Sequence, residues 1–204
     1  MAPNSSQSEI PKDWPQGTVY LRAPYYSKKL ADEALKALVF LKTDLPTPEE
    51  ARQTNPPYAN VNITKIVNPI HPAKGQYGLF ASQHLPPGSF LLPYLGYVHD
   101  KNDLDPTSDY DLSLDRDLGV GVDASRIGNE ARFINDYRRV ADAPNAEFRD
   151  MFVDIGNGKV EKRMGVFVLG AGKSGKRSKG ISRGSEILVS YGKGFWAERS
   201  RQPQ

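Results

Sequence analysis

The stretch VDASRIGNEARFIN, residues 122–135, together with ISRGSEILVSYG, residues 181–192, decides the fold of this sequence. The first stretch joins an Asp-Ala pair to a Gly-Asn pair and an Arg-Phe-Ile-Asn run, and a Pro-Asn pair follows at 144–145. An Asn-rich turn after an apolar segment is common, but a string with so many defined residues rarely arises by chance. The second stretch is an apolar run that ends in Tyr191, with the aromatic Phe195 shortly after it.

Two shorter segments come before these strings. KGQYGLFA, residues 74–81, carries two glycines separated by two residues, and YLG, residues 94–96, ends an apolar run. Glycine lets the backbone bend tightly and lets main-chain groups approach a ligand. Either segment alone is more often an ordinary turn. The two segments become informative only because they come before the longer strings in a fixed order.

In this order, the four segments resemble the motifs of SET-domain protein lysine methyltransferases over about residues 60–197. The resemblance implies a mostly β fold with some α: a SET-domain fold of small β-sheets with a knot-like C-terminal threading, preceded by a helical N-terminal segment. It divides the chain into an extended arm and helix (1–57), a SET domain (58–197) and a short tail without a zinc-binding post-SET module (198–204). Two departures stand out: one extra residue between the first glycines, and Asp136 where the family has His.

The resemblance also assigns roles to individual residues, with S-adenosylmethionine as the cofactor. It makes Tyr191 the catalytic tyrosine and Tyr110 a second active-site tyrosine. Methyl transfer from a sulfonium to an amine needs an aligned, dry site, which tyrosine hydroxyls and ring faces help to supply. The residues implied to bind the cofactor are Gly75, Gln76, Tyr77, Gly78, Asn135, Asp136 and Phe195.

A methyl-number switch in the substrate channel is expected at Phe148 or at Val189. A Phe at the first of these positions lacks the hydroxyl that would retain a water where further methyl groups must fit. We therefore hypothesise that di- or trimethylation is allowed. Phe195 is expected to pack over the cofactor or the lysine channel, whereas Trp196 is expected in the core.

The pattern of the remaining chain agrees with a mostly β domain. Apolar residues at helical spacing predict a helix over 27–42, and a short helix is expected over 126–134. Gly156, Asn157 and Gly158 lie between two apolar runs and predict a tight hairpin. Short apolar or alternating runs predict strands over 61–67, 78–82, 90–97, 118–122, 147–154, 159–169 and 187–191.

Composition excludes several classes of protein. The 204 residues include no cysteine, which excludes disulfides and thiolate zinc sites, and His71, His84 and His99 are too scattered for a metal centre. No apolar run is long enough to span a membrane, and the polar start is unlike a signal peptide. An intracellular protein is expected, in the nucleus by resemblance, with the cytoplasm as the alternative. Lacking cysteine clusters, its cofactor site would close through Phe195 and the tail, or through a partner.

Charge is distributed unevenly, although the net charge is only +3. Acidic residues between positions 100 and 117 fall in the insert that, by resemblance, lines the substrate groove. They would suit a basic, lysine-containing segment such as a histone tail, and a solvated acidic loop is the other interpretation. The basic loop of residues 173–183 would suit contact with nucleic acid or nuclear targeting, although a flexible hairpin tip is the simpler interpretation.

Three functions stay open at this level. The first is an S-adenosylmethionine-dependent protein lysine N-methyltransferase that acts on a histone or, alternatively, on a non-histone protein. The second is a SET fold with little activity that serves as a chromatin interaction module, which Asp136 and the stretched glycine motif would allow. The third is a basic nucleic-acid-binding β domain, which the dispersed aromatic residues disfavour because they form no stacking platform.

Overall fold

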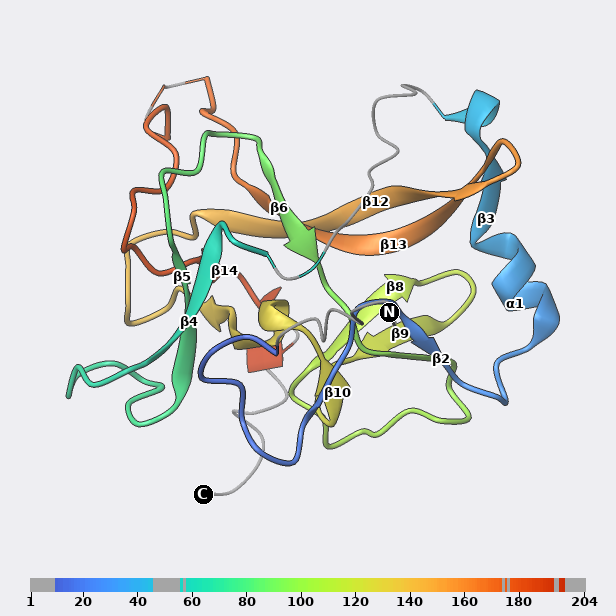
Figure 1. Ribbon diagram of the computed structural model, residues 1–204, viewed down its shortest axis with the longest axis horizontal. Coiled ribbons are helices and arrows are strands. Elements are labelled where there is room, and N and C mark those ends of the chain that lie inside the picture. Colours follow the sequence, from blue (N-terminus) through green and yellow to red (C-terminus); the bar gives the residue numbers. More distant parts are fainter. Residues whose placement is uncertain are drawn as a thin grey trace, which may run out of the picture.

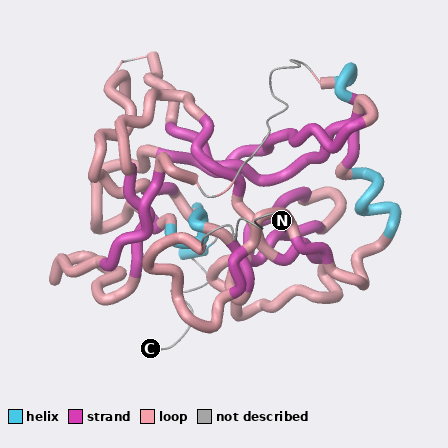
Figure 2. The backbone as a smooth tube through the Cα atoms, in the orientation of Figure 1, coloured by secondary structure: helices cyan, strands magenta, loops and turns pink. Residues whose placement is uncertain are grey.

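The computed structural model describes residues 10–45, 56, 58–173, 175, 177–192 and 195–196. Short strands dominate the ribbon (Figure 1), and helices are confined to brief stretches (Figure 2). The expected class, mostly β with small sheets, is confirmed. The helical elements are α1 (Asp32–Ala37), η1 (Lys42–Asp44) and η3 (Glu130–Phe133). The strands are β1 (Val19–Tyr20), β2 (Tyr25–Tyr26), β3 (Val39–Leu41), β4 (Val61–Lys65), β5 (Tyr77–Ala81), β6 (Phe90–Pro93), β7 (Tyr97–His99), β8 (Asp111–Asp115), β9 (Val120–Asp123), β10 (Ile127–Gly128), β11 (Asn135–Asp136), β12 (Ala146–Gly156), β13 (Lys159–Val168) and β14 (Leu188–Val189).

The largest feature is the antiparallel hairpin of β12 and β13, which runs across one side of the molecule (Figure 1). Asn157 and Gly158 at its tip have φ angles of 54° and 69°, the left-handed conformation that a tight hairpin turn requires. The predicted hairpin is therefore confirmed. Both β3 and β6 pair antiparallel with β13, so this strand organises a four-stranded sheet.

The helix predicted over residues 27–42 is wrong over most of its length. α1 spans only six residues, and Val39–Leu41 instead form β3, paired with residues 159–161 of β13. Leu30 and Leu38 are buried, so the apolar spacing does mark core contacts. The β-branched and aromatic residues that follow Leu38 suit a pleated surface better than a helix, and pairing with β13 decides their conformation.

The short helix expected over residues 126–134 is confirmed only at the four residues of η3, and it is wrong over Ile127–Gly128, which form β10. Asn129 between them has an extended backbone, with φ −128° and ψ −168°. Its buried side chain donates to the Pro93 carbonyl at 2.8 Å and accepts from the Leu95 N–H at 3.1 Å. These two contacts fix the extended conformation that interrupts the helix.

A second sheet has the order β2-β7-β9-β8 and lies below the hairpin in Figure 1. The strand expected over 90–97 is divided into β6 and β7 by a turn at Tyr94-Leu95-Gly96. A Cβ on Gly96 would lie 2.4 Å from the backbone oxygen of Asp123, so only glycine permits this close approach to β9. β8 is absent from the predicted strands, although its sequence Asp-Leu-Ser-Leu-Asp alternates polar and apolar residues as a half-buried strand does.

The two long motif stretches lie side by side in the structure. β11 and β14 pair in parallel, with Asn135 opposite Leu188. On the other edge of β14, the side chain of Asn145 accepts from the Leu188 N–H and donates to the Glu186 carbonyl, both at 2.8 Å. The backbone N–H of Asn145 also donates to the Leu188 carbonyl at 3.0 Å, so this one residue takes the place of a neighbouring strand. The knot-like threading of this segment stays a prediction.

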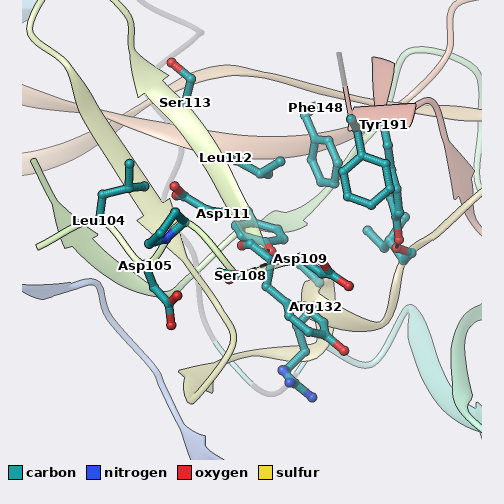
Figure 3. A pocket seen from close by; sticks show the side chains of 16 residues that line it. Leu104, Asp105, Ser108, Asp109, Asp111, Leu112, Ser113, Arg132, Phe148 and Tyr191 are labelled. Atoms are coloured by element: carbon teal, nitrogen blue, oxygen red, sulfur yellow. Dashed lines mark hydrogen bonds between the residues drawn. The ribbon is translucent and has the colours of Figure 1, made fainter. Parts of the chain in front are cut away.

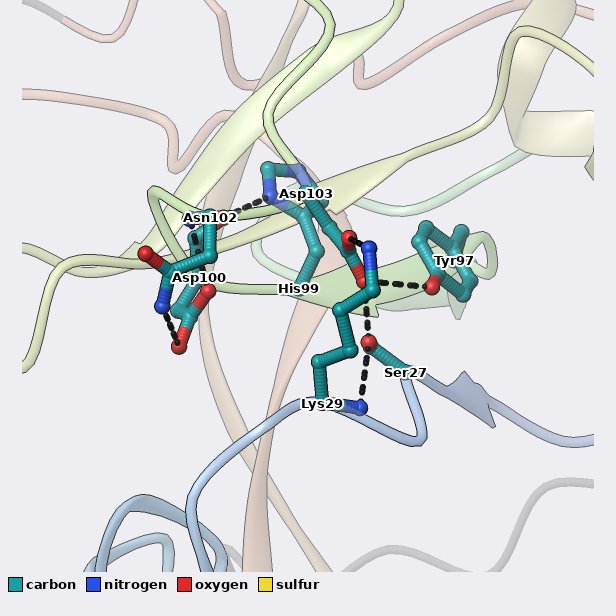
Figure 4. Close-up of polar contacts among 7 residues, drawn as sticks. All are labelled: Ser27, Lys29, Tyr97, His99, Asp100, Asn102 and Asp103. Carbon is teal, nitrogen blue, oxygen red and sulfur yellow. Dashed lines mark hydrogen bonds and ion pairs between the residues drawn. The ribbon is translucent and has the colours of Figure 1, made fainter.

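Residues that precede α1 pack against the acidic insert. β2 runs parallel to β7, and just after it Ser27 donates a hydrogen bond to Asp103 (Figure 4). Lys29 lies 2.6 Å from the same carboxylate, and the Tyr97 hydroxyl donates to it at 2.8 Å. These donors, Lys29 foremost, lower the pKa of the Asp103 carboxyl to about 2. The insert is thus tied to the N-terminal part of the described chain.

The main hydrophobic core lies between the two sheets and the β4–β5 hairpin. No helix in the described ranges is long and apolar enough to cross a membrane. Three aromatic side chains, Tyr110, Phe148 and Tyr191, are only partly buried and pack against the edge of this core. Fully or nearly fully buried members of the core include Leu79, Leu92, Val122, Val166 and Ile187.

Candidate active site

Tyr191 lies just beyond β14 and is oriented by the neighbouring strand β11. Its backbone N–H donates to Oδ2 of Asp136 at 2.8 Å, and its hydroxyl donates to the Ile134 carbonyl at 2.7 Å. Burial raises the pKa of the Tyr191 hydroxyl well above its ordinary value, so the group stays protonated at neutral pH. Phe195 meets the Tyr191 ring edge to face, with ring centroids 4.8 Å apart.

Tyr110, the second predicted tyrosine, lines the same cavity as Tyr191. Its carbonyl accepts a hydrogen bond from the Tyr94 hydroxyl at 2.7 Å, and Tyr94 in turn meets Phe148 edge to face at 5.4 Å. The guanidinium of Arg132 lies 4.7 Å from the centroid of the Tyr110 ring. The structure therefore brings the predicted tyrosines together in one aromatic group.

Two cavities meet at this aromatic group. The acidic cavity, of about 500 Å³, is bordered by Asp105, Asp109, Asp111, Leu112 and Phe148 (Figure 3). The Trp196 cavity, of about 390 Å³, is bordered by His71, Gln76, Asn135, Arg138 and Trp196. Both cavities are also lined by a common set of residues, namely Asp109, Tyr110, Arg132, Tyr191 and Phe195. A molecule in either cavity would therefore approach the same tyrosines.

Asn135 is held at the wall of the Trp196 cavity by a buried polar chain. Its Nδ2 donates to Oε1 of Glu186 at 2.8 Å, and Oε2 of Glu186 lies 3.0 Å from Nε2 of His71. The backbone N–H of Ala73 donates to Nδ1 of His71, so the imidazole proton is placed on Nε2, facing Glu186. With its amide nitrogen engaged, Asn135 has its carboxamide oxygen to offer to a ligand.

The glycine-containing segment of residues 74–81 lies next to Asn135, which lines the wall of the Trp196 cavity. A Cβ on Gly78 would lie 2.7 Å from Oε1 of Glu186 and 3.2 Å from Nδ2 of Asn135, so glycine permits the approach of these two side chains. The Tyr77 carbonyl accepts from Asn135 at 3.4 Å, and Gly75 has a φ of +86° that suits glycine. Gln76 lines the Trp196 cavity itself. Direct contact of Gly75, Tyr77 and Gly78 with a cofactor stays a prediction.

Asp136 also borders the Trp196 cavity, but its carboxylate is occupied by donors of this chain. Besides the Tyr191 N–H, the backbone N–H and Nη1 of Arg138 donate to it at 2.8 Å, and Nε1 of Trp196 donates at 3.2 Å. Trp196 is 39% exposed, so the expectation that it belongs to the core is wrong. The residues beyond it, including the predicted tail 198–204, lie outside the described part of the chain.

The two candidate switch residues differ in their access to the site. Phe148 lines the acidic cavity and stands beside Tyr191 in Figure 3. Val189 is fully buried, and it lines neither the acidic cavity nor the Trp196 cavity. Phe148 is therefore the candidate that a molecule in the acidic cavity would meet.

The acidic residues of the insert divide into two groups. Asp105, Asp109 and Asp111 border the acidic cavity, whereas Asp103 binds the N-terminal segment and Asp115 pairs with Lys162 at 3.0 Å. In the predicted basic loop over residues 173–183, the described lysines and arginines are exposed, and position 176 lies outside the described residues. Contact of this loop with nucleic acid stays a prediction.

Several cavity residues have no sequence signal that would identify them. His71 and Arg138 fall outside the quoted motifs, and Trp196 resembles an ordinary core residue in the sequence. Arg132 is the exception, because it stands within the Gly-Asn-x-x-Arg-Phe-Ile-Asn string. Within the described ranges, no group of three or more His, Cys, Asp or Glu side chains is arranged to hold a metal ion.

This chain is similar to several solved structures and to one protein family. Among solved structures, an active polycomb repressive complex 2 in the stimulated state is 28% identical with a TM-score of 0.45, and the match covers 65% of this chain and 15% of that chain. The polycomb repressive complex 2 of Chaetomium thermophilum is 24% identical with a TM-score of 0.44, over 65% and 15% of the two chains. The chain thus spans less than a fifth of the length of these proteins, and a search of curated sequences found no match. The family model described as SET domain matches residues 76–192, and this chain therefore belongs to the SET domain family.

Proposed function

We propose that this protein is an S-adenosylmethionine-dependent protein lysine N-methyltransferase. The observation that carries the proposal is the meeting of two cavities at Tyr110, Tyr191 and Phe195. A transferase must bring a donor and an acceptor together from separate sides and keep water away from the reacting atoms. Membership of the SET domain family supports the same assignment.

The Trp196 cavity suits the cofactor. Its volume of about 390 Å³ falls within the range of small-molecule sites, about 300–1,000 Å³. Trp196 and Phe195 offer aromatic faces that attract a cation, and Asn135 offers a carboxamide oxygen. S-adenosylmethionine would supply a methyl group carried on a cationic sulfur. The side chains proposed to hold it are Gln76, Asn135 and Phe195, with the Asp136 carboxylate at the cavity wall, on a backbone shaped by Gly75, Tyr77 and Gly78.

Tyr191 is proposed to orient the lysine amine. Because its hydroxyl proton is donated to the Ile134 carbonyl, its oxygen lone pairs can accept a hydrogen bond from an amine N–H. Loss of water at the partly buried junction and the nearby Arg132 guanidinium disfavour a second positive charge there. The lysine would therefore reach the junction as the neutral amine, which is the nucleophilic form.

The acidic cavity is proposed to receive a lysine within a basic protein segment, with a histone tail as the favoured substrate. Asp105, Asp109 and Asp111 border this cavity, and clustered charge of one sign raises the local concentration of an oppositely charged ligand. The acids attract the segment to this cavity, and the partly buried aromatic residues favour loss of the proton from the lysine. A nuclear location fits this substrate.

The test is methylation with labelled cofactor, using a panel of histones and a whole-cell extract. We expect labelled protein bands with the wild-type enzyme. The substitution Tyr191→Phe should reduce the rate about 100-fold or more, because an oriented hydroxyl at the reacting atoms is lost. Tyr25→Phe removes a hydroxyl from an exposed residue and serves as the matched control. Absence of cofactor binding by calorimetry, or full activity of Tyr191→Phe, would contradict the proposal.

A further inference from the structure

Asp136 is a heavily contacted carboxylate at the wall of the Trp196 cavity. Only 8% of the residue is exposed, and four donors reach its two oxygens. Oδ1 accepts from the Arg138 backbone N–H, while Oδ2 accepts from Nη1 of Arg138, the Tyr191 N–H and Nε1 of Trp196. One carboxylate therefore joins β11, the turn after it and the aromatic segment that follows Tyr191.

The hydrogen bond from Trp196 differs from the other three, because its donor belongs to an exposed residue. Trp196 is 39% exposed, and the described partners of its indole are the Asp136 carboxylate, the Phe195 ring at 5.4 Å and the Arg138 guanidinium at 5.6 Å. A hydrogen bond to a charged acceptor is stronger and more directional than partial burial of one face of a ring. The carboxylate therefore sets the orientation of the indole.

We propose that Asp136 is a positioning residue that fastens Trp196 as a wall of the cofactor cavity. The proposal rests on the proposed function for the identity of the ligand. A carboxylate has about four lone-pair sites, whereas a neutral imidazole at the same position has one acceptor nitrogen. Asp136 can thus hold Tyr191, Arg138 and Trp196 together, which the His of the family motif could not do through its ring. Asp136 in place of His therefore allows a hydrogen-bonded indole, that of Trp196, to close the cavity.

The first test needs no ligand. The chain contains two tryptophans, so Trp14→Phe leaves Trp196 as the one fluorescent indole. In this background we expect Asp136→His and Asp136→Ala to increase the quenching of Trp196 by acrylamide about twofold or more. Asp142→Ala removes an exposed acid and is the matched control. Unchanged quenching in folded Asp136 variants, checked by circular dichroism, would overturn the proposal.

The second test measures S-adenosylmethionine binding by calorimetry. Asp136→Ala and Trp196→Phe should each raise Kd about tenfold, and the double variant should resemble the single ones, because both remove one shared contact. Trp196→Phe keeps a ring at an exposed position, so it tests the hydrogen bond even where an Asp136 variant fails to fold. Additive effects, or a Kd within twofold of wild type, would overturn the role of Asp136. Absence of binding by the wild-type protein would instead overturn the proposed function, and this role with it.

Discussion

The Trp196 cavity and the acidic cavity share their innermost residues, but their outer walls come from different kinds of sequence. Much of the wall of the first comes from the strands β11 and β14 and the residues next to them, which carry the defined motif strings. The wall of the second comes from an acidic insert whose residues alternate in β8 or lie in the loop before it. Arg132 and Tyr191 of the common centre thus stand in the motif strings, whereas Asp109, Tyr110 and the outer wall of the acidic cavity depend on how the acidic insert pairs with the sheet.

The largest effect is expected from breaking the polar chain behind the Trp196 cavity. Glu186→Ala removes a carboxylate that is 9% exposed and leaves His71 and Asn135 without their partner. We expect the free energy of unfolding to fall by about 3 kcal/mol, as for other buried pairs that lose one member. The Kd for S-adenosylmethionine should rise at least tenfold, measured by calorimetry under conditions where the variant is folded. Glu147→Ala, on the surface-facing side of β12, is the control. An unchanged Kd would show that cofactor binding by Asn135 does not depend on its hydrogen bond to Glu186.

The converse experiment neutralises the acidic cavity. Asp105→Asn combined with Asp109→Asn should raise the KM for a basic peptide about tenfold at low salt, because each exposed charge contributes a fraction of a kcal/mol. The effect should shrink at high ionic strength, since exposed charges are screened. Because Asp109 also lines the Trp196 cavity, the single variant Asp105→Asn is the one expected to keep the Kd for S-adenosylmethionine within twofold of wild type. Asp100→Asn with Asp117→Asn changes the net charge equally outside this cavity and is the control. An equal effect of both pairs would indicate net charge alone.

A smaller effect, on the product rather than the rate, is expected at Phe148. Phe148→Tyr adds a hydroxyl that can hold a water inside the acidic cavity, where a methylated amine would need space. We expect wild-type protein to form di- or trimethyllysine and the variant to stop at one methyl group, measured by mass spectrometry of the modified peptide. If the wild-type enzyme itself stops at one methyl group on its true substrate, the hypothesis fails. Val189→Ile, at a buried position outside both cavities, is the control.

The smallest effect is a pH dependence of stability near the acidic cavity. Burial opposes protonation of His99, but hydrogen bonds to the Asp100 carbonyl and the Asp111 carboxylate raise its pKa above the ordinary value. A raised pKa stabilises the folded state fully below about pH 6.5, and this contribution is lost as pH rises through the pKa of the folded protein. His99→Gln should therefore destabilise the protein more at pH 6 than at pH 8.5, measured by urea unfolding. An equal loss at both values would exclude a role for the proton.

The centre of the site could be predicted because its residues stand in contiguous strings. Asn135 and Tyr191 meet through the pairing of β11 and β14, and Tyr110 joins them as expected. His71 could not be predicted, because its role depends on its distance to Glu186 in the folded chain. The helix over 27–42 failed for the same reason, since pairing with β13 outweighs the local apolar spacing. Local sequence thus predicts residues whose partners are set by a motif, and it misses those whose partners are set by packing.

Asn145, which bonds to β14 where a neighbouring strand would otherwise lie, affects the order in which the protein folds. β14 obtains its hydrogen bonds from β11 and from Asn145, which both precede it by a long interval of chain. Contacts between distant segments form slowly, because the entropy of loop closure must be overcome first. During synthesis, the two sheets can therefore fold before β14 leaves the ribosome. Tyr191, which is proposed to orient the lysine amine, is then added to a chain whose two sheets have already formed.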